Sequence, residues 1–401
     1  MRNSNISLEA RTGWSFFRHV LITALVLAFS ASLAHALDPN LLLSQYMRER
    51  WGSDKGFTGG SVTALAQSLD GYLWIGTEKG LIRFDGFNFR TFSQAAPTTF
   101  PIGPVQALVS DAQGNLWILL QSTKILRYHE GKFELGRELA EFGITSLLKR
   151  RDGSVLFASL TYGPLIYNSG KFELLAPPSP SPNSSPNSSE VTTDELSSRL
   201  SWATGVAPHR FAEPNSAVLS MAESSDGKVW LGTRDKGLFF MDDGKVVAVP
   251  LGLSDAKINC LLASGNRDLW IGTDKGLLRW DGAKGASLEV PPALRHLRVI
   301  SIIPDRDSNI WLGTPSGLIR VNPGGIVLDA SNSQTPIPVN ALLEDREGNL
   351  WAGRPSGIER LRDSAFVSFS AAGLQSESSG PVTSTGASGS GSLPLKAVFT
   401  G

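Results

Sequence analysis

The feature that most constrains this chain is a phrase that recurs at a nearly constant spacing. SLDGYLWIGTEKGLIRFDG (68–86) returns as SSDGKVWLGTRDKGLFFMDDG (224–244) and as NRDLWIGTDKGLLRWDG (266–282). Alignment on its aromatic residue gives seven repeats, at Trp74, Trp117, Phe157, Trp230, Trp270, Trp311 and Trp351. Successive aromatic residues lie 43, 40, 73, 40, 41 and 40 residues apart. This regular period predicts a repeat architecture in which neighbouring units bury a shared core.

Each repeat is typical of four short β-strands. An apolar run such as VTALA (62–66) precedes the aromatic strand, LWIGT (73–77), and runs such as LIRF (81–84) and FNFRTF (87–92) follow it. These runs are too short for helices, and Asp-Gly pairs between them indicate hairpins because Gly adopts positive φ. Four-stranded units of this length are propeller blades. The sequence therefore predicts an all-β fold, a seven-bladed β-propeller of four-stranded antiparallel blades.

The recurring aromatic residues are interpreted as structural core, each wedged between successive blades. The alternative is a stacking platform for sugars or bases, which needs exposed rings; Trp51 and Trp202, outside the repeat, are the better candidates for exposed aromatic residues. Ten residues before each aromatic residue, the innermost strand carries Ala64, Ala107, Leu147, Ser220, Cys260, Ser301 or Ala341, and six of these seven are small. Cys260, the only cysteine, is therefore interpreted as a core residue, and the chain has no internal disulfide.

The remaining segments divide the chain. Residues 1–36 combine a basic start, an apolar run and a small-residue cleavage site, which predicts a secretory signal peptide; an uncleaved anchor is the alternative. The propeller is expected over 37–370, interrupted by a disordered Pro/Ser/Asn-rich insertion at about 173–215. Residues 371–401 are expected to form a Gly/Ser-rich linker and the start of a further, truncated blade. For ring closure, either 45–51 or 364–369 is expected to supply the outer strand of the last blade.

The repeats resemble the two-component regulator propeller repeats, which build the periplasmic sensor regions of bacterial hybrid histidine kinases and some diguanylate cyclases. The matching residues are VTALAQSLDGYLWIGTEKGLIRFDG (62–86), VNALLEDREGNLWAGRPSGIERL (339–361) and the lead-in QYMRERWGSDKGF (45–57). The resemblance covers residues 45–370. It departs from the family pattern where Arg354 replaces the Thr of the phrase in the seventh repeat.

This resemblance implies a periplasmic ligand-sensing propeller of a two-component-type receptor, tethered to the inner membrane in its full-length form. The signal would pass to an output domain missing from this chain, and any kinase or cyclase activity would lie there, so the region present is not expected to be an enzyme. Expected partners are an extracellular small molecule or oligosaccharide and the output domain, with a homodimer left open. Two alternatives stay open: a free-standing exported interaction or scaffold propeller, and a propeller polysaccharide lyase or hydrolase.

Composition and motifs argue against several classes of binding and catalytic function. Lys plus Arg and Asp plus Glu both number 37, so no basic excess favours nucleic acid as a partner. His129, His209 and His296 lack the spacing of metal ligands. The chain has no nucleotide-binding loop and no serine-hydrolase elbow. We therefore predict no catalytic residue, no metal and no cofactor.

One face of the propeller is the predicted ligand-binding face. In a four-stranded blade, the turn between the second and third strands lies on the same side as the links between blades. That side carries the predicted ligand-binding residues Lys79, Arg234, Lys275 and Arg354, and an acidic saccharide would suit their charge. The alternative is that these are ordinary solvated turn residues beside compensating acids.

Overall fold

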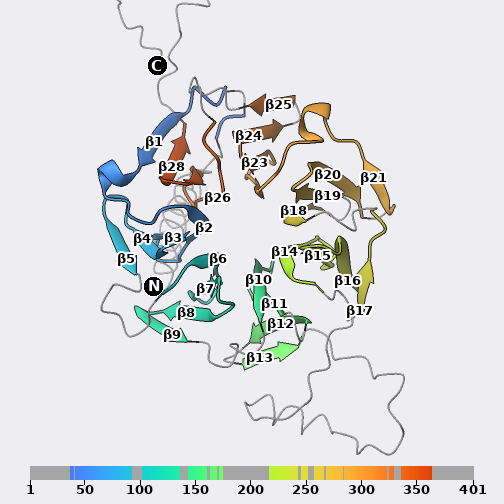
Figure 1. Ribbon diagram of the computed structural model, residues 1–401, viewed down its shortest axis with the longest axis horizontal. Helices are drawn as coiled ribbons and strands as arrows, with labels where there is room; N and C mark the ends of the chain where they lie inside the picture. Colours follow the sequence, from blue (N-terminus) through green and yellow to red (C-terminus); the bar gives the residue numbers. More distant parts are fainter. Residues whose placement is uncertain are drawn as a thin grey trace, which may run out of the picture. The chain divides into compact units, whose positions relative to one another are not determined.

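The computed structural model describes residues 37–39, 41–92, 102–135, 143–159, 163–168, 171–174, 216–242, 245–251, 257–265, 268–282, 284–322, 325–328 and 336–363. Within these ranges the chain forms seven sheets of four antiparallel strands. The sheets stand side by side around a common centre as the blades of a propeller (Figure 1). The prediction of a seven-bladed β-propeller is confirmed.

Six blades follow one another along the chain, each in strand order from the centre outward. Blade 1 holds β2 (Val62–Gln67), β3 (Leu73–Thr77), β4 (Gly80–Phe84) and β5 (Phe89–Phe92). Blade 2 holds β6 (Val105–Ser110), β7 (Leu116–Leu120), β8 (Ile125–His129) and β9 (Lys132–Leu135). Blade 3 holds β10 (Ile144–Lys149), β11 (Val155–Ser159), β12 (Gly163–Asn168) and β13 (Lys171–Leu174).

The second half of the ring repeats this plan. Blade 4 holds β14 (Val218–Glu223), β15 (Val229–Thr233), β16 (Leu238–Asp242) and β17 (Lys245–Ala248). Blade 5 holds β18 (Ile258–Ser264), β19 (Asp268–Thr273), β20 (Leu277–Asp281) and β21 (Ala286–Leu288). Blade 6 holds β22 (Ser301–Pro304), β23 (Ile310–Thr314), β24 (Gly317–Asn322) and β25 (Gly325–Leu328). The described residues also include two short 3-10 segments, η1 (Ser53–Lys55) and η3 (Pro292–Leu294).

Blade 7 is assembled from both ends of the propeller. Its inner strands are β26 (Ala341–Glu344), β27 (Leu350–Arg354) and β28 (Gly357–Arg362), and its outer strand is β1 (Met47–Trp51). β1 pairs with β28 from Met47 opposite Arg362 to Trp51 opposite Ile358. Of the two closures that the sequence left open, the structure therefore shows the N-terminal one (Figure 1). Residues 364–369 lie outside the described residues.

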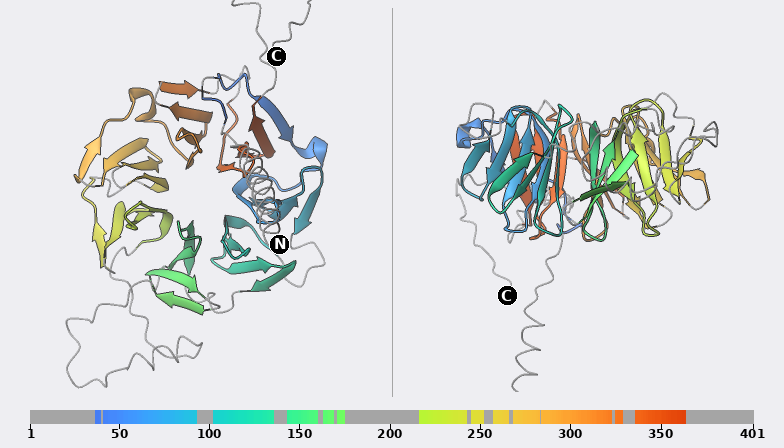
Figure 2. Two further views of the ribbon diagram at one scale, coloured as in Figure 1. Left: turned by 180° about the vertical axis from the view of Figure 1, so that it is seen from behind. Right: turned by 90° about the horizontal axis from the view of Figure 1, so that it is seen from below.

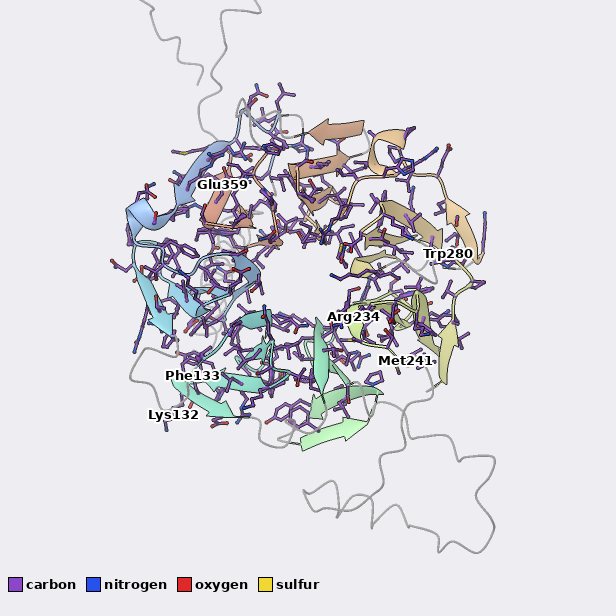
Figure 3. All side chains as sticks on the ribbon, viewed as in Figure 1. Lys132, Phe133, Arg234, Met241, Trp280 and Glu359 are labelled. Carbon is purple, nitrogen blue, oxygen red and sulfur yellow. The ribbon has the colours of Figure 1, made fainter. Side chains whose placement is uncertain are left out.

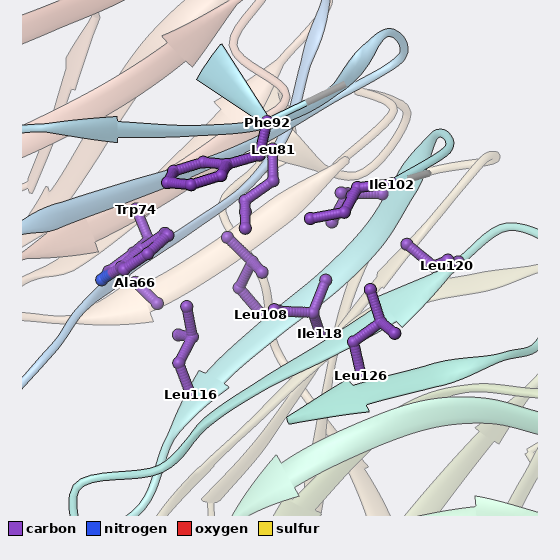
Figure 4. Close-up of a cluster of buried hydrophobic side chains, with 11 residues drawn as sticks. Ala66, Trp74, Leu81, Phe92, Ile102, Leu108, Leu116, Ile118, Leu120 and Leu126 are labelled. Atoms are coloured by element: carbon purple, nitrogen blue, oxygen red, sulfur yellow. The ribbon is translucent and has the colours of Figure 1, made fainter. Parts of the chain in front are cut away.

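The seams between blades hold the apolar core. Trp74 of blade 1 is fully buried in one cluster with Val105, Leu108 and Leu116 of blade 2 (Figure 4). Trp117, Trp230, Trp270, Trp311 and Trp351 occupy the corresponding place, each packed against the following blade or, for Trp351, against blade 1. These six indoles hold successive blades together, because a buried Trp removes roughly 150–250 Å² from water.

Blade 3 departs from the alignment by one residue. Phe157 is buried, but it packs with Trp117 in the seam before blade 3, and Leu156 packs toward blade 4 in the place of the Trp. The strand register agrees, since Ser146 pairs with Ala158 just as Ala64 pairs with Gly76. With this shift Ser146 replaces Leu147 at the innermost position, and all seven residues of that set are small.

A close approach between blades explains why Gly stands two residues after the aromatic residue in five of the repeats. An ideal Cβ at Gly76 would lie 2.6 Å from Val105 Cγ1, a contact that real Cβ atoms do not make. The same conflict would arise at Gly232, Gly272, Gly313 and Gly353, each facing a β-branched residue that opens the next blade. Gly is therefore required because the following inner strand packs directly on the backbone.

Three of the seam indoles donate their N–H groups to a carboxylate of the same blade. Trp117 Nε1 donates to Asp111 Oδ2 at 2.9 Å, and Trp311 and Trp351 donate to Asp305 and Asp345 at 2.8 and 2.7 Å. These carboxylates also accept hydrogen bonds from the backbone of their own turn. The turn acids of these blades thus hold the buried Trp in register, a role beyond the turn formation that the sequence indicated.

The expectation for Trp51 is wrong. Trp51 is partly buried at the seam between blades 7 and 1, where it stacks on Trp351 with ring centroids 5.5 Å apart. Trp202, residues 1–36, the insertion apart from its first two residues, and residues 371–401 lie outside the described residues. No helix in the part of the chain that the structure describes is long and apolar enough to cross a membrane.

Candidate functional site

The turns between the second and third strands of the blades have a common construction. In blade 1, Thr77 Oγ1 donates to the Gly80 carbonyl at 2.8 Å and accepts from the backbone N–H of Lys79 at 3.2 Å. The threonines of blades 4, 5 and 6 make the same donation at 2.7, 2.8 and 2.9 Å: Thr233, Thr273 and Thr314. The Thr of the recurring phrase therefore closes a tight turn that presents between one and three side chains to solvent.

These turns lie beside the links that enter each blade. The backbone N–H of Glu78 donates to the Ser61 carbonyl at 3.1 Å, and that of Arg234 donates to the Ala217 carbonyl at 3.0 Å. Ser61 and Ala217 each stand directly before the innermost strand of their blade. The turns and the links thus share one side of the ring, which we call the turn face. Figure 2 shows the ring from behind and from the side.

Three of the four predicted ligand-binding residues are exposed on the turn face: Lys79, Arg234 and Lys275. Arg234 lies toward the inner part of its blade (Figure 3). Their side chains form no ion pair with any described residue, whereas the neighbouring Asp274 is bound by Arg298 at 3.0 Å and by Asn259 at 2.8 Å. The acid beside Lys275 is thus already engaged, so the lysine charge is available to an anion.

Arg354 is placed differently from the other three. Its side chain is 8% exposed, its Nε lies 2.7 Å from Glu359 Oε2, and its Nη1 donates to the Ile337 carbonyl at 2.8 Å. It replaces the Thr that closes this turn in other blades, and it fills the space beneath the turn instead of reaching solvent. Its geometry is that of a structural residue.

Arg354 belongs to what we call the closure cluster, which is centred on Glu359 and completed by Arg48 and Arg50. Glu359 is labelled in Figure 3. Glu359 is fully buried, and the Nε atoms of Arg48 and Arg50 each lie 2.8 Å from its Oε1. Burial raises the pKa of Glu359, but the charges of Arg354 and Arg48 outweigh it, and its pKa falls below the ordinary 4.5. This buried carboxylate ties β1 to β27 and β28.

Two other reactive side chains of the described residues are His129 and Cys260. His129 lies 3.9 Å from Glu130 at an exposed turn, and burial raises the pKa of the Cys260 thiol to about 12, which keeps it protonated at neutral pH. Among the described residues, no group of three or more His, Cys, Asp or Glu side chains is arranged to hold a metal ion.

The structure also contains a cavity that the sequence analysis did not predict. It has a volume of about 660 Å³ and lies between blades 5 and 6, beside Trp270 and Arg279. The signal available in the sequence is the small Val321 in a position where four other blades carry an aromatic residue: Phe84, Tyr128, Tyr167 and Trp280. The sequence alone does not show that Val321 faces Trp270, because the strand register decides which side chains share a seam.

The comparisons with known proteins agree with this fold. A family model described as the two component regulator propeller matches residues 212–235, which contain the first two strands of blade 4. The resemblance that the sequence predicted is therefore confirmed. No curated protein matches the sequence.

Several solved structures share the architecture at low identity. The extracellular domain of the hybrid two-component system BT3049 from B. thetaiotaomicron matches with a TM-score of 0.58 and 19% identity, over 80% of this chain and 42% of that one. The corresponding domain of BT4673 matches with a TM-score of 0.57 and 20% identity, over 79% and 40%. The chain thus spans about two fifths of these domains.

A propeller of another kind also matches. The virginiamycin B lyase of Staphylococcus aureus, solved with quinupristin, has a TM-score of 0.57 and 12% identity, over 79% of this chain and 99% of that one. At these identities the likenesses establish the fold alone, because unrelated functions share the propeller architecture.

Proposed function

We propose that this chain is the periplasmic ligand-sensing propeller of a two-component-type receptor, and that the turn face binds the ligand. The observation that carries the proposal is the set of three exposed cationic side chains that form no ion pair with a described residue and stand on equivalent turns on one side of the ring. The matching repeat and the similar extracellular domains of hybrid two-component systems support the receptor class. The output domain would lie outside this chain.

The spacing of the three cations favours an extended anionic ligand. Arg234 and Lys275 come from neighbouring blades, whereas Lys79 comes from blade 1 on the other side of the ring (Figure 1). A small molecule cannot contact all three, but an acidic oligosaccharide lying across the turn face can. We therefore propose an acidic oligosaccharide as the ligand class, with Arg354 acting in the fold instead of in recognition.

The test is calorimetric titration of the full chain with oligogalacturonate, using a neutral malto-oligosaccharide of equal length for comparison. The triple variant Lys79→Ala, Arg234→Ala, Lys275→Ala should bind the acidic chain roughly tenfold more weakly, because each exposed charge contributes a fraction of a kcal/mol. A matched control replaces three exposed lysines on the opposite side, Lys132, Lys149 and Lys284, and should bind as the wild type does.

Three outcomes would contradict the proposal. Equal binding of acidic and neutral chains would remove the role of charge. Equal weakening in both triple variants would show a nonspecific electrostatic effect instead of a site. Cleavage of the oligosaccharide would favour the lyase or hydrolase alternative, for which the match to a whole lyase propeller is the supporting observation.

A further inference from the structure

The cavity between blades 5 and 6 lies at a seam where Trp270 has no aromatic partner among the described residues. Its lining combines apolar side chains with two carboxylates and one guanidinium: Ser264, Asp268, Trp270, Arg279, Glu289, Val290, Pro291, Pro292, Ser308, Ile310, Val321 and Asn322. Trp270 and Asp268 stand at the start of β19, whereas Lys275 follows the end of that strand. The cavity is thus separate from the turn face.

The seam between blades 2 and 3 shows how such a space is normally filled. Trp117 is paired across the blade with Arg127 of β8. Tyr167 of blade 3 packs its ring on Trp117 at a centroid distance of 4.7 Å, and its hydroxyl accepts from Arg127 Nη1 at 2.6 Å. A Trp, a cross-strand Arg and a Tyr from the next blade therefore form one unit.

The seam between blades 6 and 7 rebuilds this unit with a different tyrosine. Trp311 pairs across the blade with Arg320, but the following blade offers Leu361 in place of an aromatic residue. Tyr46, from the segment before β1, supplies the ring at 6.4 Å from Trp311, and its hydroxyl accepts from Arg320 Nη1. Two separate parts of the chain thus deliver a phenol to the same kind of Trp and Arg pair.

The seam between blades 5 and 6 keeps the Trp and the Arg but not the phenol. Trp270 pairs with Arg279, whose guanidinium carbon lies 4.9 Å from the ring centroid. Val321 is the fifth residue of β24, as Tyr167 is the fifth residue of β12, so a valine stands where blade 3 carries its tyrosine. Within the described chain no aromatic ring packs on Trp270, and Trp270, Arg279 and Val321 all line the cavity.

The polar groups around this space also match a phenol. Arg279 Nη2 donates to Asp268 Oδ2 at 2.7 Å, and Nε of the same guanidinium is buried without a hydrogen-bond partner. A guanidinium has five N–H donors, so Arg279 can hold Asp268 and a ligand oxygen together. The Asp268 carboxylate can accept a hydrogen bond that the ligand hydroxyl donates.

We propose that this cavity is a binding site for a small phenolic compound. The ring lies against Trp270 in the place that Tyr167 occupies one half-ring away, and the hydroxyl accepts from Arg279. The volume of about 660 Å³ exceeds a single ring and lies within the range of ligand pockets, so substituents extend over Pro291 and Pro292. The inference goes beyond the proposed function, because it rests on the seam packing and holds whether or not the turn face binds a saccharide.

The test uses p-cresol, which is the tyrosine side chain cut at Cβ, with toluene as the same shape without the hydroxyl. Calorimetry and saturation-transfer NMR on the full chain should show one p-cresol site, with toluene binding about tenfold more weakly because the hydrogen bond to Arg279 is lost. Arg279→Leu should abolish that preference. No binding of p-cresol by the wild type, or equal binding of both compounds, would overturn the proposal.

Two further variants locate the site. Val321→Tyr fills the cavity with the chain's own phenol and should abolish p-cresol binding, and Val321→Leu, a smaller change, should weaken it. Tyr167→Val is the matched change at the seam between blades 2 and 3, and it should create a second p-cresol site beside Trp117 and Arg127. Unchanged binding in both Val321 variants would place the compound elsewhere and reject the site.

Discussion

Blades 1 and 7 are neighbours built from the same phrase, but they are held together by different forces. Blade 1 is one continuous stretch whose second turn is closed by Thr77, and its seams are apolar. Blade 7 combines β26 to β28 with β1, a strand from the other end of the propeller, and Arg354 stands where Thr77 would be. No covalent hairpin holds its outer strand.

The difference shows that ion pairs hold a strand in place where no hairpin connects it to its blade. β1 is fastened by the closure cluster, by Trp51 stacked on Trp351, and by Glu49 bridging to Arg360 and Arg362. A buried carboxylate between three guanidinium groups is costly to desolvate, so it persists only where the geometry supplies all of its partners. Such a cluster makes the last pairing specific.

The largest expected effect is on Glu359. Glu359→Gln leaves Arg48, Arg50 and Arg354 without their shared carboxylate, and it should lower the free energy of unfolding by about 3–5 kcal/mol. Urea denaturation gives the value, and hydrogen exchange should show β1 opening first. The control Asp268→Asn breaks a pair with Arg279 whose side chains are each 32% exposed, and it should cost about 0–1 kcal/mol. Equal losses would show that the closure cluster is not special.

The second effect is a dependence on acid. The pKa of Glu359 is lower in the folded chain than its ordinary 4.5, so the unfolded chain takes up the proton first as the pH falls. Stability from this group is complete above pH 4.5 and is lost as the pH falls through the folded pKa. Between pH 6 and 3 the wild type should therefore lose more stability than Glu359→Gln. Parallel pH profiles would contradict this assignment.

The third prediction concerns the aromatic part of the closure. Trp51→Ala removes a partly buried indole from Trp351 and should cost about 1–3 kcal/mol. Trp74→Ala at the continuous seam removes a fully buried indole and should cost about 3–5 kcal/mol. Thermal unfolding of the two variants gives the order. A larger loss for Trp51 than for Trp74 would mean that aromatic stacking, and not the closure cluster, holds β1.

The smallest effect is expected at the turn of blade 1. Thr77→Val keeps the shape of the side chain but removes the hydrogen bonds to Gly80 and Lys79, and it should cost about 1 kcal/mol. The matched variant Thr314→Val in blade 6 should lose a similar amount. If Thr77→Val costs nothing by urea denaturation, the Thr of the phrase is not what closes these turns.

Much of the fold was predictable because the repeat states the same packing problem seven times. The period, the short apolar runs and the Gly of the phrase are local patterns, so the number of blades and their strands follow from them. The one-residue shift in blade 3 was not predictable, because Phe157 is a better match to the repeat than Leu156. Only the pairing of Ser146 with Ala158 shows which of the two faces blade 4.

Some residues of the candidate sites were predictable from the sequence and others were not. The sequence predicted Lys79, Arg234 and Lys275 on one face. Successive strands of a blade run in opposite directions, so equivalent turns of different blades lie on the same side of the ring. The burial of Arg354 could not be foreseen, because its partner Glu359 is covered only when β1 pairs with β28 and brings Arg48 and Arg50 onto the same carboxylate. The cavity beside Trp270 depends on which residue of one blade meets which residue of the next, and no local pattern encodes that.

By itself, the sequence determined the architecture: seven four-stranded blades with a Trp in most seams, because period and hydrophobic alternation are properties of short stretches. The tertiary structure decided how the ring closes, which arginine is buried and which seam is left unfilled. Those outcomes arise where residues hundreds of positions apart come into contact, as Arg48 and Glu359 do, and contact at that range depends on the geometry of the closed ring.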